Sequence, residues 1–281
     1  MVIMCKKTVM SWCSNYIVVF LMAFFVIPIF LSGCATVPLT ERRSLHLVPD
    51  SELLTLSFQE YKKILSESRL SRNQRQVQLV KNVGFKIARA AEAFLKETGK
   101  QELISKYRWE FNLIEDDKTV NAWVLPGGKA AVYTGILPFT RDETGLAVVL
   151  GHEVAHAIAN HGNERMSNGL LSQMGGTALS IALANNPQMT QQIFMTVFGI
   201  GAKVGFLLPY SRLQESEADK IGLILMARAG YDPNEAIAFW KRMSQQGGVK
   251  PPEFLSTHPN PDTRINSIRK NIPEAMRYYR K

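Results

Sequence analysis

The stretch His152-Glu153-Val154-Ala155-His156 decides the fold of this chain, because it has the form H-E-x-x-H. Residues four apart in an α-helix lie on the same face, so the two imidazoles point the same way. Two such imidazoles can bind one Zn²⁺, and the glutamate after the first can serve as base for a water on that metal. We therefore expect a helix that carries half of a catalytic zinc site.

The residues around the motif predict the helix that it needs. Leu146 to Ala159 is an apolar run, and Asp142 stands ahead of it as an N-terminal cap. We expect the helix to end near residues 160–162, where His161 would serve the helix end. Chance alone places H-E-x-x-H in roughly one chain of this length in a hundred, so the rest of the sequence must decide whether a zinc site exists.

The composition is that of a globular protein with a basic surface. The 281 residues are 46% hydrophobic and 20% charged, with a formal net charge of +9. Such a chain is long enough for one large domain or two small ones. Its basic residues are spread along the sequence, without the basic runs and interleaved aromatic residues of a nucleic-acid surface. We therefore expect no nucleic-acid partner and a basic surface near membrane lipid.

The N-terminal segment predicts export and lipid attachment. Lys6 and Lys7 precede an apolar stretch, residues 16–31, that is short for a membrane span. The stretch runs into Leu31-Ser32-Gly33-Cys34, which resembles a bacterial lipobox. That resemblance implies a lipoprotein signal peptide over residues 1–33 and acylation of Cys34. An ordinary signal peptide or an uncleaved anchor is the alternative.

The cysteine count agrees with lipid attachment. The chain has three cysteines, and Cys5 and Cys13 would leave with the signal peptide, so the mature protein would have no thiol to pair. Ala35 rather than aspartate follows Cys34. By resemblance to enterobacterial sorting, this predicts an outer-membrane lipoprotein facing the periplasm, with the inner membrane as the alternative. We expect residues 34–49 to form an irregular tether and residues 50–281 the metallopeptidase domain.

Periodicity predicts a mainly helical α+β domain. Apolar residues recur at helical spacing from residue 50 onward and again over 72–98, and the motif helix follows a region of period two. That region contains three expected strands, near residues 109–113, 121–125 and 130–134, in a small antiparallel sheet. An edge strand of such a sheet can hold an extended substrate by backbone pairing.

Residues 166–208 form an apolar segment rich in glycine and methionine that follows the motif helix. We expect helices over 163–184 and 189–208. Ser172 and Gln173 interrupt the first and Lys203 the second, so each apolar stretch is too short to span a bilayer, and a membrane-spanning hairpin is the alternative. They would either contact the membrane or form a lid over a cleft. Further helices are expected over residues 210–229, 234–245 and 262–270.

A catalytic zinc needs three protein ligands, so the motif requires one more. A metzincin has a histidine six residues after the motif, where this chain has Gly162, and no glutamate stands at the thermolysin spacing. Glu164 follows the motif at the end of its helix, where we expect solvated surface. Glu215 remains, and Asp219 lies one helical turn later, where it can accept a hydrogen bond from a ligating imidazole. We expect Glu217 to be structural or exposed.

The two halves of this pattern carry a family resemblance. H-E-V-A-H, followed by E-S-E-A-D at 215–219 and preceded by V-N-A-W-V-L-P-G-G-K at 120–129, resembles the gluzincin family of the CaaX prenyl protease and HtpX. The chain is most similar to the bacterial periplasmic lipoproteins of that family, over residues 47–269. The resemblance implies a zincin-like metalloprotease fold with one zinc, ligands His152, His156 and Glu215, and Glu153 as catalytic glutamate. It also implies a catalytic role for Asp219, for which we favour the orienting role.

His258 precedes a proline in a loop, and the family has a His-Pro at the matching place. It is a candidate either to stabilise the oxyanion or to cap the zinc, and both roles stay open; Tyr210 is a weaker oxyanion candidate.

Together these features predict a lipid-anchored zinc endopeptidase that hydrolyses peptide bonds of envelope proteins. Its partners would be protein or peptide substrates, and the membrane through lipidated Cys34. The alternatives are a zinc-containing chaperone or assembly factor for outer-membrane proteins, and an inert lipoprotein with a chance motif.

Overall fold

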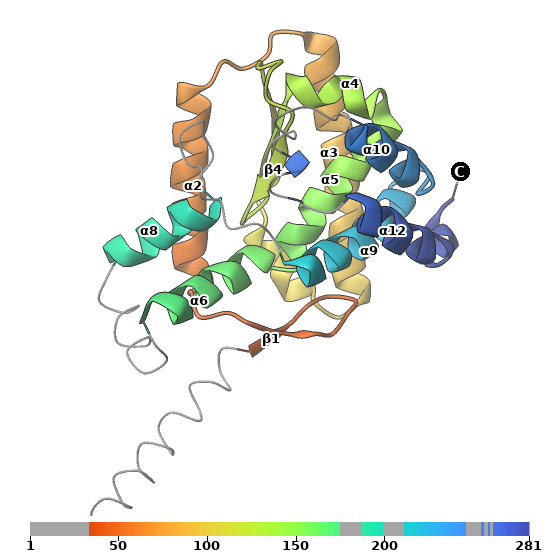
Figure 1. The fold of residues 1–281 in the computed structure, drawn as a ribbon. Helices are drawn as coiled ribbons and strands as arrows, with labels where there is room; N and C mark the ends of the chain where they lie inside the picture. The colour runs from red at the N-terminus through yellow and green to blue at the C-terminus, as the bar shows by residue number, and fades with distance from the viewer. Residues whose placement is uncertain are drawn as a thin grey trace, which may run out of the picture.

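The computed structural model describes residues 34–174, 187–198, 211–245, 254–255, 258 and 261–280 (Figure 1). The expected signal peptide and Tyr210 lie outside these residues, as do parts of the segment 166–208. No helix in the described ranges has the length and apolar character needed to cross a membrane.

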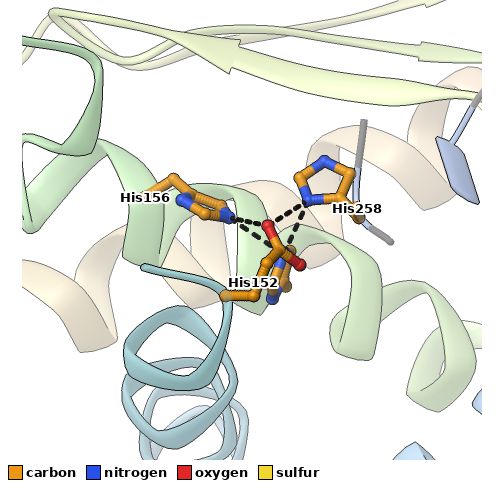
Figure 2. A group of neighbouring side chains, drawn as sticks. His152, His156 and His258 are labelled. Atoms are coloured by element: carbon orange, nitrogen blue, oxygen red, sulfur yellow. Dashed lines mark hydrogen bonds and ion pairs between the residues drawn. The ribbon is translucent and has the colours of Figure 1, made fainter. Parts of the chain in front are cut away.

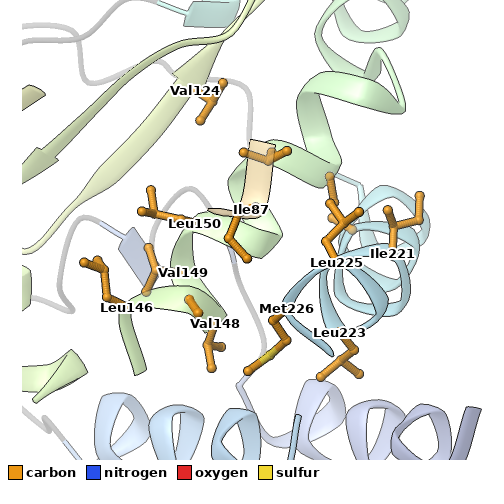
Figure 3. Packing of buried hydrophobic residues seen from close by; sticks show 14 of the residues in the cluster. Ile87, Val124, Leu146, Val148, Val149, Leu150, Ile221, Leu223, Leu225 and Met226 are labelled. Atoms are coloured by element: carbon orange, nitrogen blue, oxygen red, sulfur yellow. The ribbon is translucent and has the colours of Figure 1, made fainter. Parts of the chain in front are cut away.

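Helix α5 (Glu143–Ile158) runs through the middle of the structure and carries the motif (Figure 1). The side chain of Asp142 caps it, as predicted, by accepting hydrogen bonds from the amides of Thr144 and Gly145 at 2.8 and 3.0 Å. Almost every residue of α5 is buried, because α3 (Gln74–Glu97), α9 (Arg212–Arg228) and the sheet pack around it. Figure 3 shows this core, where the following side chains lie together: Ile87, Val124, Leu146, Val149, Leu150, Ile221 and Leu225.

Helices α5 and α9 pack against each other closely at a pair of glycines. A Cβ atom at Gly222 would lie 2.9 Å from the backbone nitrogen of His152, and one at Gly151 would lie 3.0 Å from the carbonyl oxygen of Gly222. Contacts this short leave no room for a side chain at either position. The crossing brings the first turns of α9 beside the motif.

The sheet has three strands in the order β3-β5-β4. Strand β4 (Ala122–Leu125) pairs antiparallel with β5 (Lys129–Tyr133) through a turn in which Gly127 and Gly128 have φ values of +82° and +85°. Strand β3 (Glu110–Ile114) is parallel to β5, so the prediction of a fully antiparallel sheet is wrong. Alternating polarity predicts which residues share a face, but it does not fix strand direction.

Residues 34–49 were expected to form an irregular tether, but the structure gives them regular elements. Strands β1 (Cys34–Thr36) and β2 (Arg43–Leu45) form an antiparallel hairpin, and Val37 in its turn region is buried in the main core. Tertiary contacts order this segment, although its own polar, proline-containing sequence favours no regular element. The domain boundary at residue 50 stays a prediction.

A second, smaller core lies on the far side of the sheet. Helices α2 (Asp50–Glu67), α6 (His161–Met174) and α8 (Pro187–Phe198) bury apolar side chains there against Trp123 and Leu125 of β4. The predicted helices of segment 166–208 are thus present in part, and α6 starts two residues earlier than expected.

The C-terminal helices cover α9 and α5 from the other side (Figure 1). Helix α10 (Glu235–Ser244) lies close to its predicted range, whereas α12 (Pro261–Ala275) is longer than the expected 262–270. The short elements are η1 (Gln101–Lys106), η2 (Thr134–Ile136), α4 (Leu137–Thr140) and η3 (Met276–Tyr278). The predicted fold class, a mainly helical α+β domain, is confirmed.

Candidate metal centre

The three side chains predicted as zinc ligands lie together at the crossing of α5 and α9. His152 Nε2 is 3.0 Å from His156 Nε2, and the Glu215 carboxylate is 3.3 Å from His156 and 3.6 Å from His152. All three residues are only 2% exposed. A capping box between Ser211 and Gln214 fixes the start of α9 and so places Glu215 in its first turn.

His258 completes the group, although it comes from a different part of the chain. Its Nδ1 lies 3.1 Å from His152 Nε2 and 2.8 Å from Glu215 Oε1 (Figure 2). Figure 2 shows the three imidazoles turned toward one another. One donor atom from each of the four residues lies within 4.8 Å of the others.

The spacing of these donors fits a zinc ion. Ligand atoms about 2.0–2.1 Å from a tetrahedral zinc lie about 3.3 Å from one another. Five of the six distances between these groups run from 2.8 to 3.6 Å, and all four donor atoms lie within 4.8 Å of one another. Two imidazoles, a carboxylate and a further imidazole are also the donor types that zinc prefers.

The charges of the group fit a cation as well. Burial and the neighbouring His152 hold the pKa of His156 well below its ordinary value, so this imidazole is neutral, as a ligand must be. Burial opposes ionisation of Glu215, but His258 and Arg264 outweigh it, and its pKa stays well below the ordinary value. Burial also opposes protonation of His258, yet Glu215 and Glu153 raise its pKa to about 9. The buried carboxylates of Glu215 and Glu153 thus favour a positive charge between the donor side chains.

Glu153 lies beside this group without belonging to the donor set. Its side chain is 3% exposed, and its Oε1 lies 3.2 Å from Nε2 of His258. The motif glutamate is therefore held next to the donors on the side of His258.

His152 is held from behind by an acidic and a basic residue. Asp219 Oδ1 lies 3.1 Å from His152 Nδ1. Arg264 of α12 donates to both carboxylate oxygens of Asp219, at 2.9 and 2.5 Å, and its Nη1 lies 2.7 Å from Glu215 Oε2. Burial raises the pKa of Asp219, but the charge of Arg264 and the hydrogen bonds from His152 and Arg264 together outweigh burial and lower this pKa below its ordinary value. An ionised Asp219 suits the orienting role expected of it.

No motif or spacing in the sequence points directly to Arg264. Its guanidinium is buried and lies 3.6 Å from the centre of the Trp240 ring. The only signal that points to such a residue is indirect: Glu215 and Asp219 on a buried helix require a cationic partner.

His156 is held from behind by His161, which does not serve a helix end as expected. The two Nδ1 atoms are 2.8 Å apart, and His161 Nε2 lies 3.3 Å from Glu217. Glu217 is buried and structural, and its hydrogen bonds from His161, Arg42 and Thr40 outweigh burial and lower its pKa to about 2.

Glu164 is not solvated surface, which corrects another expectation. It lies in α6 and accepts two hydrogen bonds from Arg42, at 2.6 and 2.8 Å, and one from Gln214 at 2.8 Å. The prediction failed because a new helix begins at His161 and turns Glu164 toward the N-terminal hairpin.

Comparison with known sequences decides the family. The profile described as "Peptidase family M48" matches residues 84–272. The chain belongs to this family. The predicted class, a zinc metalloendopeptidase, and its zinc cofactor are thereby confirmed, and Glu153 and the four donor residues all lie within the matched range.

Relatives of this M48 chain include the mitochondrial metalloendopeptidase OMA1 of Schizosaccharomyces pombe, 35% identical over 85% of this chain and 67% of the relative. Human mitochondrial metalloendopeptidase OMA1 is 37% identical over 62% of this chain and 34% of its own length. The beta-barrel assembly-enhancing protease of Yersinia pestis is 29% identical over 57% of this chain and 34% of its own length. The M48 chain thus aligns with about a third to two thirds of each of these relatives.

These relatives contradict the predicted location. The OMA1 proteins of two yeasts, human and Arabidopsis thaliana, which are 34–37% identical, are mitochondrial, whereas the bacterial relative is more distant. The expectation of a bacterial outer-membrane lipoprotein facing the periplasm is therefore wrong. Membership of M48 agrees with the metallopeptidase part of the family resemblance and does not extend to its bacterial lipoprotein branch.

Proposed function

We propose that the chain hydrolyses internal peptide bonds of protein substrates, with one zinc held by His152, His156 and Glu215. The observation that carries this proposal is the convergence of these three buried donors at the glycine crossing of α5 and α9. Zinc, when bound, supplies a Lewis acid that lowers the pKa of a coordinated water and polarises the scissile carbonyl. Strand β4, at the edge of the sheet beside α5, offers backbone groups to an extended substrate.

Glu153 is the general base in this proposal. It is buried beside the donor atoms, within reach of a water there, and it is not itself one of them. Glu153 takes a proton from the attacking water and passes it to the nitrogen of the leaving amine. Asp219 holds the Nδ1 side of His152, which keeps the Nε2 lone pair directed at the metal.

The position of His258 favours its role as a cap on the zinc over its role as a donor to the oxyanion. Its Nδ1 lies among the donor atoms, in the place that a catalytic zinc keeps for water or substrate. A cap predicts that His258→Ala weakens zinc binding and spares kcat. An oxyanion donor predicts the reverse, with kcat falling about 10²–10³-fold at unchanged zinc affinity.

Glu153→Gln tests the enzymatic proposal. Because Glu153 is not a ligand, the variant should bind one equivalent of zinc and lose about 10²–10⁴ in kcat/KM on an unfolded protein substrate. Glu143→Gln, an exposed change at the start of the same helix, is the matched control and should cleave normally. Full cleavage by Glu153→Gln would reject the assignment. Loss of cleavage with full cellular function would favour the chaperone alternative.

We further propose that Cys34 is acylated and attaches the domain to a membrane surface. The support is the sequence Leu31-Ser32-Gly33-Cys34 and the hairpin whose first strand begins at Cys34. The protein would then act on substrates at that surface. Cys34→Ser should abolish incorporation of labelled palmitate and release the protein from membranes, and persistent labelling would reject the site.

A further inference from the structure

His156 is backed by a line of polar side chains that ends in the N-terminal hairpin. Its Nδ1 lies 2.8 Å from Nδ1 of His161, whose Nε2 lies 3.3 Å from Oε2 of Glu217. Arg42 donates from Nε to the same oxygen at 2.8 Å, and the Thr40 hydroxyl donates to Oε1 at 2.5 Å. His156, His161 and Glu217 are no more than 5% exposed.

The direction of each hydrogen bond in this line follows from its acidic end. A carboxylate only accepts, so Glu217 requires the proton of neutral His161 on Nε2. The Nδ1 of His161 is then a lone pair, which requires a proton on Nδ1 of His156. The lone pair of His156 is thereby left on Nε2, the atom that faces the other donors.

This arrangement differs from the usual support of a metal-binding histidine. A ligating imidazole normally donates its second N–H directly to a carboxylate, a backbone carbonyl or water. Here a second imidazole stands between the ligand and the carboxylate. The carboxylate is in turn held by a residue 175 positions away in the sequence, because Arg42 binds Glu217.

Arg42 also ties the two helices of this line together. Its Nη atoms donate to both oxygens of Glu164 on α6, three residues after His161, while its Nε donates to Glu217 on α9. The guanidinium therefore fixes the carboxylate of Glu217 relative to the helix that carries His161. Its planar fork suits this task, since it serves two carboxylates at once.

We propose that His161, Glu217 and Arg42 are positioning residues that fix the tautomer and orientation of His156, so that docking of the N-terminal hairpin sets the affinity for zinc. This inference rests on the proposed assignment of His156 as a zinc ligand. It gives the hairpin a function beyond attachment: a segment far from the motif in sequence holds one of its two histidines.

The test is zinc affinity of the full chain, measured by competition with a chromophoric chelator. His161→Phe keeps the ring and removes both nitrogens, and it should weaken zinc binding about 10–100-fold. His161→Gln should bind zinc within about threefold of wild type, because its amide oxygen accepts from His156 and its amide nitrogen donates to Glu217. Arg42→Ala should weaken binding about tenfold, at the lower end of the range for such supporting contacts.

Arg228→Ala is the matched control. Arg228 binds both oxygens of Glu97, at 2.9 and 2.6 Å, and its side chain is 16% exposed, against 20% for Arg42. Its ion pair is with Glu97 rather than with a donor residue, so its loss should leave zinc affinity unchanged. Thermal unfolding of each metal-free variant identifies any that fail to fold. If His161→Phe does not fold, Arg42→Ala still tests the proposal, because Arg42 is only half-buried.

Wild-type zinc affinity in Arg42→Ala and His161→Phe would overturn the proposal, as would an equal loss in Arg228→Ala. His156→Ala separates this failure from that of the proposed metal site. If His156→Ala loses zinc while Arg42→Ala and His161→Phe keep it, only the positioning role fails. If His156→Ala keeps zinc at full affinity, the ligand assignment fails too.

Discussion

The two histidines of the motif lie one turn apart on α5, yet they are supported in different ways. Behind His152, the carboxylate of Asp219 and the buried arginine that neutralises it both contact the imidazole directly. Behind His156, a second imidazole contacts the ligand, and the carboxylate and arginine follow one step farther away. The arginine on the first side is 4% exposed, and the one on the second side is 20% exposed.

The difference lies in which parts of the chain provide the support. Arg264 comes from α12, so the His152 side is built from helices that follow the motif. Arg42 comes from the hairpin that precedes it, and α6 supplies His161. Helix α9 serves both sides, because Glu217 and Asp219 are two residues apart and turn away from each other. One side is therefore a sealed part of the core, while the other depends on a peripheral segment.

The largest effect should come from removing the arginine of the sealed side. Arg264→Met leaves Glu215 and Asp219 without their buried cation, and breaking such a pair costs about 3–5 kcal/mol of unfolding free energy. Arg42→Met, on the other side, should cost only about 1–2 kcal/mol, because water reaches Arg42 and Glu164 in part. Denaturant unfolding of the two variants, freed of metal with a chelator, measures both losses of unfolding free energy. Equal losses would show that the two sides do not differ in burial.

This contrast also explains how much the sequence could predict. His152, His156, Glu215 and Asp219 are related by helical spacing or by elimination among carboxylates, so local pattern was enough to name them. Arg264 and Arg42 could not be found this way, because the chain has 33 lysines and arginines and spacing does not single out either one. What selects them is burial against carboxylates 45 and 175 residues away, which only the tertiary structure supplies.

The fold shows the same limit. The cap at Asp142, the buried α5 and the start of α2 follow from residues within one or two turns, and they were predicted. The parallel pairing of β3 with β5 and the docking of the N-terminal hairpin depend on contacts between distant segments, and they were not. His161 belongs to this second group, since its partner Glu217 is 56 residues away.

A change that affects both sides together should have an intermediate effect. Gly222→Ala puts a methyl group 2.9 Å from the backbone of His152, so α9 must move away from α5 and carry Glu215 with it. Overpacking of this kind costs about 1–3 kcal/mol, and zinc affinity should fall as well, because the donors separate. Both quantities are measured by unfolding and by chelator competition.

Gly169→Ala is the control for the glycine crossing. Gly169 lies in helix α6, and the added methyl group would lie 3.6 Å from Ile193, which is an ordinary contact distance. Alanine lowers the entropy of the unfolded chain, so stability should rise by about 0.4–1 kcal/mol. If Gly222→Ala behaved in the same way, the close crossing would not be what places Glu215.

The smallest effect concerns the independence of the two sides. Within the described residues, Asp219 and Arg42 share no hydrogen-bond partner, so the losses of zinc-binding free energy in Asp219→Asn and Arg42→Ala should add to within about 0.5 kcal/mol. Arg42→Ala and His161→Phe act on one line, so the arginine should matter little once the imidazole is gone, with a coupling of about 0.5–3 kcal/mol. Chelator competition on the two cycles measures both couplings. A coupling of that size across the sides would mean that α9 shifts as one body, carrying Glu217 and Asp219 together, and the two histidines would then share a single support.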